Sequence, residues 1–205
     1  MQMVETRILS DEWDVNRRLT EMALDRDRLL KVVDVAASAA ADSTPHHPAN
    51  AAGTFAYQHG TWSIRDQFVG DDWVIDRADS VEAIRNDDTM VKVVYSNVDV
   101  AGDLDHGPKP RSRKGAGSER VCNGFLFDDL PQYAPAQDDK YATYFLMVDE
   151  RGAAELTRPV IRGGTFSSYV ERIILSDGGD LLDGDSLLTD KDDVADDFDP
   201  QVIRK

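Results

Sequence analysis

Residues 90–99, MVKVVYSNVD, are the stretch of sequence that decides the fold class. The segment is rich in valine and contains a tyrosine, and both residue types are enriched in strands. Its alternation of apolar and polar residues is imperfect, as in a central strand that is partly covered on both faces. A second run at 141–148, YATYFLMV, is almost continuously apolar and predicts another buried strand. The sequence therefore predicts a sheet with a buried centre.

One long helix is predicted before the sheet, over residues 10–40. Ser10 is a suitable N-cap, and Asp11 and Glu12 follow in the first turn, where the helix dipole favours acids. Apolar residues then recur mostly at spacings of three or four, with one gap of seven, as one buried helix face requires. These residues are Leu19, Met22, Leu29, Leu30, Val33 and Ala37. Pro45 follows the helix, and helices usually end before a proline.

The rest of the chain predicts short elements. Residues 42–53 have a loop composition. Short strands are expected at 55–59, 73–77 and 121–127, and short helical segments at 61–69, 79–85 and 153–157. Residues 166–175 are expected to form a final strand or a short helix, and their β-branched residues favour the strand. This order predicts an α+β fold, with an N-terminal helix, a largely antiparallel sheet and short helical insertions. We expect residues 1–176 to form a single domain, sheet-rich over 54–176, and residues 177–205 to form an acidic flexible C-terminal tail.

The composition indicates an acidic protein with a real core. Hydrophobic residues make up 41% of the 205 residues, and the net charge is −16. Acidic residues are 31 Asp and 8 Glu. Aspartate favours turns and caps, so the excess predicts a loop-rich surface. It reflects either genome composition and salt adaptation or a surface that meets a basic partner.

Cysteine content and hydropathy indicate the cellular compartment in which the protein is expected. Cys122 is the only cysteine, so no intramolecular disulfide forms, and a reducing compartment fits best. No stretch approaches the roughly 18 apolar residues that cross a bilayer, and the N-terminus lacks the apolar core of a signal peptide. We therefore expect a cytoplasmic protein without a membrane partner.

The C-terminal segment 177–199 contains ten Asp and one Lys, interrupted by leucine, valine and phenylalanine. Acidic and apolar residues in alternation are typical of segments that dock onto basic, apolar-rimmed grooves. A solubilising tail without a partner explains the same composition. The segment could also fold back over the protein's own basic loop, or bind calcium weakly through the glycines and aspartates of 177–185. The candidate binding residues are Asp180, Asp183, Asp185, Asp192, Asp193, Asp196 and Asp197.

Residues 109–120, KPRSRKGAGSER, form an isolated basic segment. Guanidinium groups and a glycine-containing backbone can wrap a phosphate, so the segment is a candidate for binding nucleic acid or phosphate. A surface loop that neutralises nearby aspartates, or a protein contact, are the alternatives. The order of its lysine and glycines does not match a P-loop. The candidate binding residues are Lys109, Arg111, Arg113, Lys114 and Arg120.

Other motifs are weaker. Asp103, Asp105 and His106 in GDLDHG are weak candidates for a divalent metal site of a phosphoesterase, but an Asp-x-Asp pattern arises easily by chance in an Asp-rich chain. His46 and His47 read as loop histidines. Residues 60–73 contain two tryptophans that are expected in the core, although an exposed one beside Arg65 would indicate an interface. No cofactor and no catalytic residue are predicted.

Three functions follow from these features. The leading hypothesis is a non-catalytic acidic interaction protein that engages a basic protein surface, as an inhibitor or regulator of a nucleic-acid-binding complex of the kind that mobile elements encode. The alternatives are a single-stranded nucleic-acid-binding protein, in which the acidic tail competes for residues 109–120, and a metal-dependent phosphoesterase. The leading hypothesis gains if acids of the folded part line one face and loses if they scatter: Asp11, Asp14, Asp71, Asp72, Asp87 and Asp88.

Overall fold

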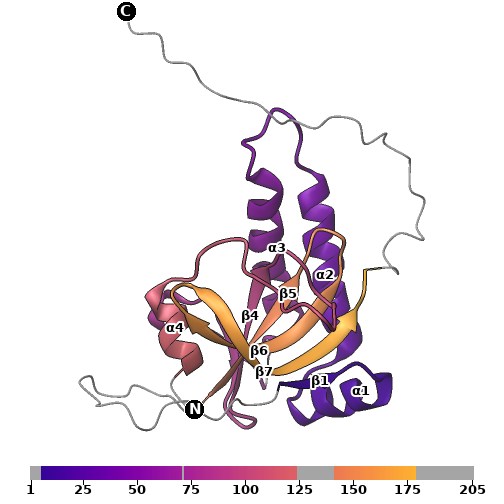
Figure 1. Ribbon diagram of the computed structural model, residues 1–205, viewed down its shortest axis with the longest axis vertical. Helices are drawn as coiled ribbons and strands as arrows, with labels where there is room; N and C mark the ends of the chain where they lie inside the picture. The colour runs from indigo at the N-terminus through magenta and orange to yellow at the C-terminus, as the bar shows by residue number, and fades with distance from the viewer. Residues whose placement is uncertain (1–5, 71, 124–140, 179–205) are drawn as a thin grey trace, which may run out of the picture.

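The computed structural model describes residues 6–70, 72–123 and 141–178. A seven-stranded sheet forms its centre, in the order β1-β7-β6-β5-β4-β3-β2 (Figure 1). The strands are β1 (Arg7–Leu9), β2 (Val74–Asp76), β3 (Ala83–Asn86), β4 (Val91–Asn97), β5 (Ala142–Val148), β6 (Ala154–Arg162) and β7 (Thr165–Ser176). The helices are α1 (Glu12–Glu21), α2 (Arg26–Ala41), α3 (Ala51–Phe68) and α4 (Ala116–Asn123), with a short 3-10 helix η1 (Ala78–Ser80). The fold is therefore mixed α+β, as predicted.

The sheet is mixed rather than largely antiparallel. β1 pairs with β7 and β4 pairs with β5 in parallel, while the other pairings are antiparallel. Parallel neighbours need a crossover connection, and the chain from β4 to β5 provides one that contains α4. The strand predicted at 121–127 is wrong where the structure describes it, because residues 121–123 belong to α4. This helix packs mainly on β6.

The predicted helix over 10–40 is two helices, α1 and α2. The chain turns between them at Ala23, whose φ of 56° interrupts the helix. The Asp25 carboxylate accepts a hydrogen bond from the backbone N–H of Arg28 and caps α2. The Trp73 indole N–H donates to the carbonyl of Ala23 at 3.0 Å, which holds the turn against the sheet. Asp11, rather than Ser10, caps α1.

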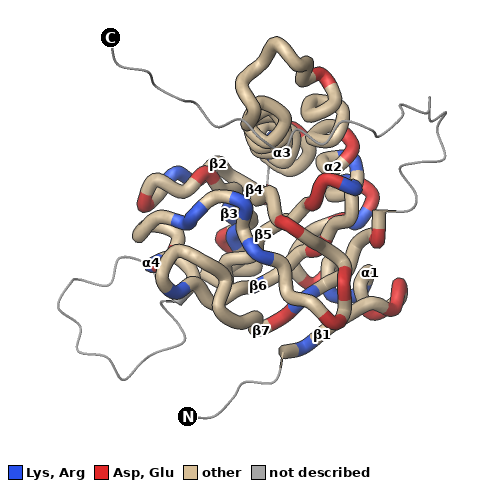
Figure 2. The backbone as a smooth tube through the Cα atoms, turned by 45° about the horizontal axis from the view of Figure 1, so that its top comes forward, with Lys and Arg blue, Asp and Glu red and all other residues tan. Residues whose placement is uncertain are grey.

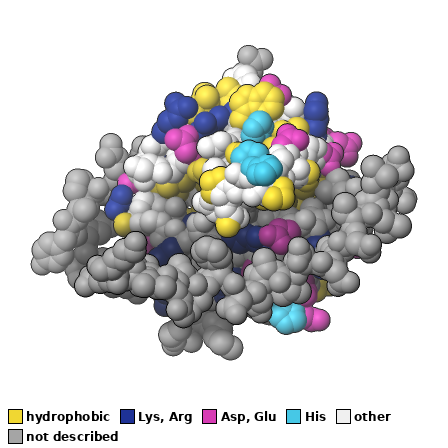
Figure 3. All heavy atoms as spheres, turned by 90° about the horizontal axis from the view of Figure 1, so that it is seen from above, with side chains coloured by type: hydrophobic (Ala, Val, Ile, Leu, Met, Phe, Trp, Pro, Cys, Tyr) yellow, Lys and Arg dark blue, Asp and Glu magenta, His cyan; other side chains and the backbone are white. Residues whose placement is uncertain are grey.

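Residues 51–68 form one helix, α3, where a strand and a short helix were predicted. α2 and α3 make a hairpin that extends well beyond the sheet (Figure 1). The view from above looks onto its tip, where histidine and hydrophobic side chains lie side by side (Figure 3). The helical turn predicted at 153–157 is wrong as well, since residues 154–162 form β6. The helical segment predicted at 79–85 is reduced to η1, followed by β3.

Different layers cover the two faces of the sheet. On the helical face, α1, α2 and α3 pack against alternate strand residues that include Val93, Tyr95, Leu146 and Ile173. On the loop face, α4 and the segment from Val98 pack against Val94, Phe145, Met147 and Phe166. Both faces are apolar at their centres, which explains the imperfect alternation of β4. In the described part of the chain, no helix is both long enough and apolar enough to cross a membrane.

Candidate functional site

The basic segment 109–120 lies on the loop face, and the protein itself engages most of its positive groups. The Lys109 ammonium donates to the carbonyl of Phe166 at 2.9 Å. Arg111 donates to the carbonyl of Val98 and pairs with Glu150. Arg120 pairs with Asp79 at 2.8 Å. Arg113 is exposed and lies against the turn at Gly164 between β6 and β7.

Lys114 fastens this segment to the sheet. Its ammonium lies 2.7 Å from the hydroxyl of Ser96 and over the rings of Phe145 and Phe166, 5.5 and 5.6 Å from their centres. Its backbone N–H donates to the carbonyl of Gly164. Burial lowers the pKa of the Lys114 ammonium to about 8. Ser96 is fully buried, so this contact lies beneath the surface of the loop face.

Asp103 and His106 stabilise a turn of their own. The Asp103 carboxylate accepts hydrogen bonds from the backbone N–H groups of Asp105 and His106, at 2.8 and 3.2 Å, and contacts the His106 ring at 3.1 Å. Hydrogen bonding, first from the Asp105 N–H, lowers the pKa of Asp103. Among the described residues, no group of three or more His, Cys, Asp or Glu side chains is arranged to hold a metal ion.

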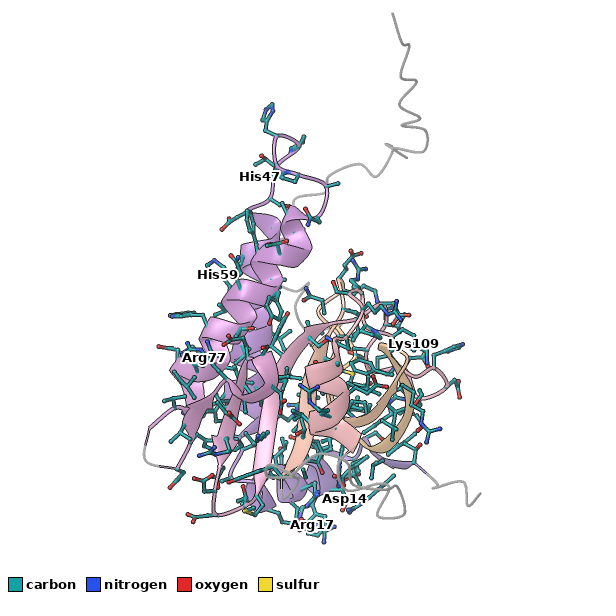
Figure 4. All side chains as sticks on the ribbon, turned by 90° about the vertical axis from the view of Figure 1, so that its left-hand side faces the viewer. Asp14, Arg17, His47, His59, Arg77 and Lys109 are labelled. Atoms are coloured by element: carbon teal, nitrogen blue, oxygen red, sulfur yellow. The ribbon has the colours of Figure 1, made fainter. Side chains whose placement is uncertain are left out.

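The other reactive residue types lie apart from one another. His47 is at the tip of the helical hairpin and accepts a hydrogen bond from the backbone N–H of Thr44. His59 lies further down α3, and both are distant from Lys109 in the side view (Figure 4). Cys122 is buried in α4, and burial raises the pKa of its thiol to about 12, which keeps it protonated and unreactive.

A buried ion pair on the loop face was not predicted from the sequence. Arg172 donates twice to the carboxylate of Glu155, at 3.0 and 2.6 Å, and the two side chains are 3% and 0% exposed. The hydroxyl of Thr157 and the backbone N–H of Gly102 complete the partners of Glu155. Arg172 also donates to the carbonyl of Asp103, so the pair anchors the loop after β4.

The helical face holds a second unpredicted cluster, around Glu171. Its carboxylate accepts hydrogen bonds from Arg7 at 3.1 Å, from Arg18 at 3.0 Å and from the Tyr144 hydroxyl at 2.6 Å. Burial, and then the Glu171 carboxylate, raise the pKa of Tyr144 to about 12. The cluster ties β1 and α1 to the sheet. The sequence signal for Glu171 is a glutamate inside the strand pattern of residues 166–175, whereas Glu155 lies in a segment that was predicted to be helical.

Unpaired acids gather at the end of the molecule opposite the hairpin tip. A half-open cleft of about 240 Å³ between α1 and the start of α2 is lined by Glu12, Asp25 and Asp27. Their carboxylates are exposed and form no ion pair with any described residue. The cleft also contains Arg26, whose guanidinium donates to the carbonyl of Leu175. Acidic and basic positions are interspersed along α1 and the start of α2 (Figure 2).

Two acids from other segments lie at the same end. Asp72 precedes Trp73, whose indole contacts the turn between α1 and α2. Asp88 lies in the turn between β3 and β4, and β3 runs back beside the start of β2, with Val74 opposite Arg85. Both α1 and this turn are at the lower end of Figure 1. We call Glu12, Asp25, Asp27, Asp72 and Asp88 the acidic end.

The remaining predicted acids are placed as follows. Asp11 caps α1, and Asp14 pairs with Arg17 at the lower end of the side view (Figure 4). Asp87 pairs with Arg85 and accepts a hydrogen bond from Tyr141. Asp71 and the predicted tail residues Asp180, Asp183, Asp185, Asp192, Asp193, Asp196 and Asp197 lie outside the described residues.

No protein family model, curated protein or solved structure matches this chain. The described residues include 24 acidic and 19 basic side chains, a net charge of −5. The other segments contain 15 acidic and 4 basic side chains, a net charge of −11. The described fold is close to electrically balanced, and most of the acidic excess lies in the rest of the chain.

Proposed function

We propose that this protein is a non-catalytic acidic interaction protein that binds a basic protein surface through its acidic end. The observation that carries the proposal is the asymmetry between the two kinds of charge. The positive groups of residues 109–120 mostly contact the protein's own carbonyls, carboxylates and a hydroxyl. The five carboxylates of the acidic end have no ionic partner among the described residues, and of these only Asp25 is engaged, as the cap that accepts the backbone N–H of Arg28. Free surface charge attracts an oppositely charged partner.

The composition of the cleft fits the side chains of a basic partner. Three carboxylates around a cleft of about 240 Å³ suit the charged end of a lysine or arginine side chain. Trp13 on α1 is 68% exposed, the highest value among the large apolar side chains described. Exposed tryptophans are over-represented among residues that dominate binding energy. The tail aspartates would extend the same attraction, and a basic groove that normally holds nucleic acid would be a suitable target.

The alternative function, binding of single-stranded nucleic acid, has less support. A phosphate would have to displace Lys109, Arg111, Lys114 and Arg120 from the contacts that hold the loop on the sheet. Arg113 alone of the five is exposed without such a bond among the described residues. The net charge of −16 adds a general repulsion. The phosphoesterase hypothesis has no further observation in its favour.

The proposal is tested with a fluorescent arginine- and lysine-rich peptide and the full chain. The triple variant Glu12→Gln/Asp25→Asn/Asp27→Asn removes the cleft charges, and asparagine retains the helix cap at position 25. We expect its affinity, measured by fluorescence anisotropy, to fall about tenfold, which corresponds to about 1.4 kcal/mol.

A matched control distinguishes a loss of affinity caused by the cleft charges from one caused by the change in net charge. The triple variant Asp34→Asn/Asp42→Asn/Asp66→Asn removes the same charge from exposed positions on α2, its C-cap and α3. We expect an affinity within about twofold of the unmodified chain, since distant exposed charges are screened. Equal losses in both variants would show that only net charge matters and would overturn the role of the acidic end. A single-stranded oligonucleotide that binds more tightly than the peptide would instead support the alternative function.

A further inference from the structure

The outer edge of β2 is an open sheet edge with an apolar border. Within residues 6–70, 72–123 and 141–178, β2 pairs with β3 alone. The side chains of Val74 and Ile75 are 41% and 44% exposed. An unprotected edge of this kind presents backbone N–H and C=O groups that pair readily with another strand.

The helix next to this edge continues the apolar border. α3 and its C-cap Val69 lead toward β2, and Trp62 of α3 and Val69 are 57% and 40% exposed. Trp62 and Arg65 are three residues apart and therefore on one side of the helix, and Val69 follows as its extended C-cap. Arg65 of α3 pairs with Glu82 at the entry to β3, which places that side of α3 near the β2 edge. Four of the eight large exposed apolar side chains of the described chain thus come from residues 62–75.

The two ends of β2 have opposite charge. At the end of the strand, Arg77 and Arg65 share the single carboxylate of Glu82, which leaves one positive charge in excess. At the start, Asp72 is exposed and has no ion pair with a described residue. A strand that is negative at one end and positive at the other complements a second copy of itself in the antiparallel direction.

We propose that the β2 edge is a homodimer interface, in which β2 of two copies pair antiparallel around Ile75. A two-fold axis at Ile75 places this side chain opposite its own copy on the helical face. The same axis brings Arg77 of each copy beside residues 72–73 of the other copy. It also places the exposed side of α3 from each copy next to the new strand pair. Arg77 and Lys109 are on opposite sides of the molecule in Figure 4, so the interface is separate from the loop face.

Salt should strengthen this dimer, which distinguishes it from the proposed contact with a basic partner. Two copies with a net charge of −16 each repel one another at long range, and salt screens this repulsion while leaving apolar contacts and backbone hydrogen bonds. Sedimentation equilibrium of the full chain should show a concentration-dependent shift from monomer to dimer mass, at lower concentration in about 0.5 M salt, where the Debye length is about 4–5 Å.

Two substitutions locate the interface. Ile75→Lys places like charges opposite each other, and we expect the dimer dissociation constant to rise at least about tenfold. Ile8→Lys is the matched control at the opposite edge of the sheet, where Ile8 is 40% exposed, and should leave the dissociation constant unchanged. Both residues are exposed, so circular dichroism should report an intact fold.

A charge exchange tests the register. Asp72→Arg and Arg77→Asp should each weaken the dimer, and the double variant should recover at least half of the loss in log affinity, because each new arginine faces a new aspartate. The proposal is overturned if the unmodified chain stays at monomer mass in salt at every concentration. It is also overturned if Ile8→Lys, rather than Ile75→Lys, dissociates the dimer, or if the double variant is no better than the single ones.

Discussion

Glu171 and Arg172 are neighbours in β7, and they point to opposite faces of the sheet, where ionised groups meet different surroundings. On the helical face, Glu171 is 4% exposed, but its partners Arg7 and Arg18 have side chains that are 52% and 25% exposed. On the loop face, both members of the Glu155–Arg172 pair are almost fully buried. Two adjacent residues in one strand thus take part in similar ion pairs that differ in their access to water.

The covering layers explain this difference. Arg18 lies on the flank of α1 and Arg7 lies in the edge strand β1, so that both guanidinium groups reach Glu171 as well as the solvent. An irregular segment has backbone groups that need partners, and buried charges on the sheet supply them, as Glu155 does for Gly102 and Arg172 does for Asp103. Charge on the loop face therefore substitutes for the regular hydrogen bonding that a helix would provide.

The largest effect is expected when the loop-face pair is broken. Arg172→Met leaves the Glu155 carboxylate buried with only a hydroxyl and one backbone N–H, and should lower the free energy of unfolding by about 3–5 kcal/mol. Chemical denaturation measures the change. The double variant Glu155→Gln/Arg172→Met, which contains no buried charge, should recover more than half of the loss. A loss below about 1 kcal/mol in the single variant would mean that water reaches Glu155, and the contrast between the faces would disappear.

A smaller effect is expected on the helical face. Glu171→Gln removes the charge that Arg7, Arg18 and Tyr144 share, but water can solvate both guanidinium groups. The free energy of unfolding should fall by about 1–3 kcal/mol. The control is Glu21→Gln, which removes only the exposed partner of Arg18 and should cost about 0.5 kcal/mol or less. If Glu171→Gln costs as much as Arg172→Met, the two faces do not differ in the way described.

The smallest effect is expected at Lys114, where the substitution should raise the free energy of unfolding rather than lower it. Burial lowers the pKa of this ammonium from 10.5 to about 8, so the folded state binds its proton less tightly than the unfolded state. The penalty is fully present below pH 8 and is relieved as the pH rises from about 8 toward 10.5. Lys114→Met should therefore stabilise the protein at neutral pH by about 1 kcal/mol, after the lost bond to Ser96 is counted.

The pH dependence provides the check for Lys114→Met. Thermal unfolding over this pH range should show stability that rises with pH for the unmodified chain and rises less for the variant. The exposed Lys31 on α2 supplies the control, Lys31→Met, which should retain the original slope. Destabilisation of Lys114→Met at neutral pH, or an unchanged slope, would show that Lys114 is better solvated than its position indicates.

The sequence predicted the elements whose local preference and burial agree. β4, β5 and β7 are rich in β-branched and aromatic residues and also lie within the sheet, so their positions were predicted closely. α3 contains many of the same residue types, yet its packing against α2 makes it helical. In the apolar pattern of residues 10–40, Met22 and Leu29 are seven positions apart, which also fits one continuous helix. The break before α2 was therefore not predicted, although Asp25 is a suitable N-cap.

The candidate site was harder to predict, because charge in a sequence does not reveal which groups the fold uses. Residues 109–120 read as a free basic loop, but their contacts are with residues such as Asp79, Glu150 and Phe166, which are distant in sequence. Conversely, Glu12 and Asp27 are unremarkable in a helical pattern, and only the turn at Ala23 brings them to one cleft. The topology, and not the composition, therefore determines which charged groups form contacts within the protein and which remain exposed without an ionic partner.

The parallel pairing of β1 with β7 has a consequence for synthesis of the chain. Arg7 and Glu171, which this pairing joins, are separated by 164 positions. Bringing distant segments together costs closure entropy before any contact compensates for it, which slows folding. During translation, β1 and α1 leave the ribosome well before β7, so β1 lacks its sheet partner until nearly all of the described chain has followed.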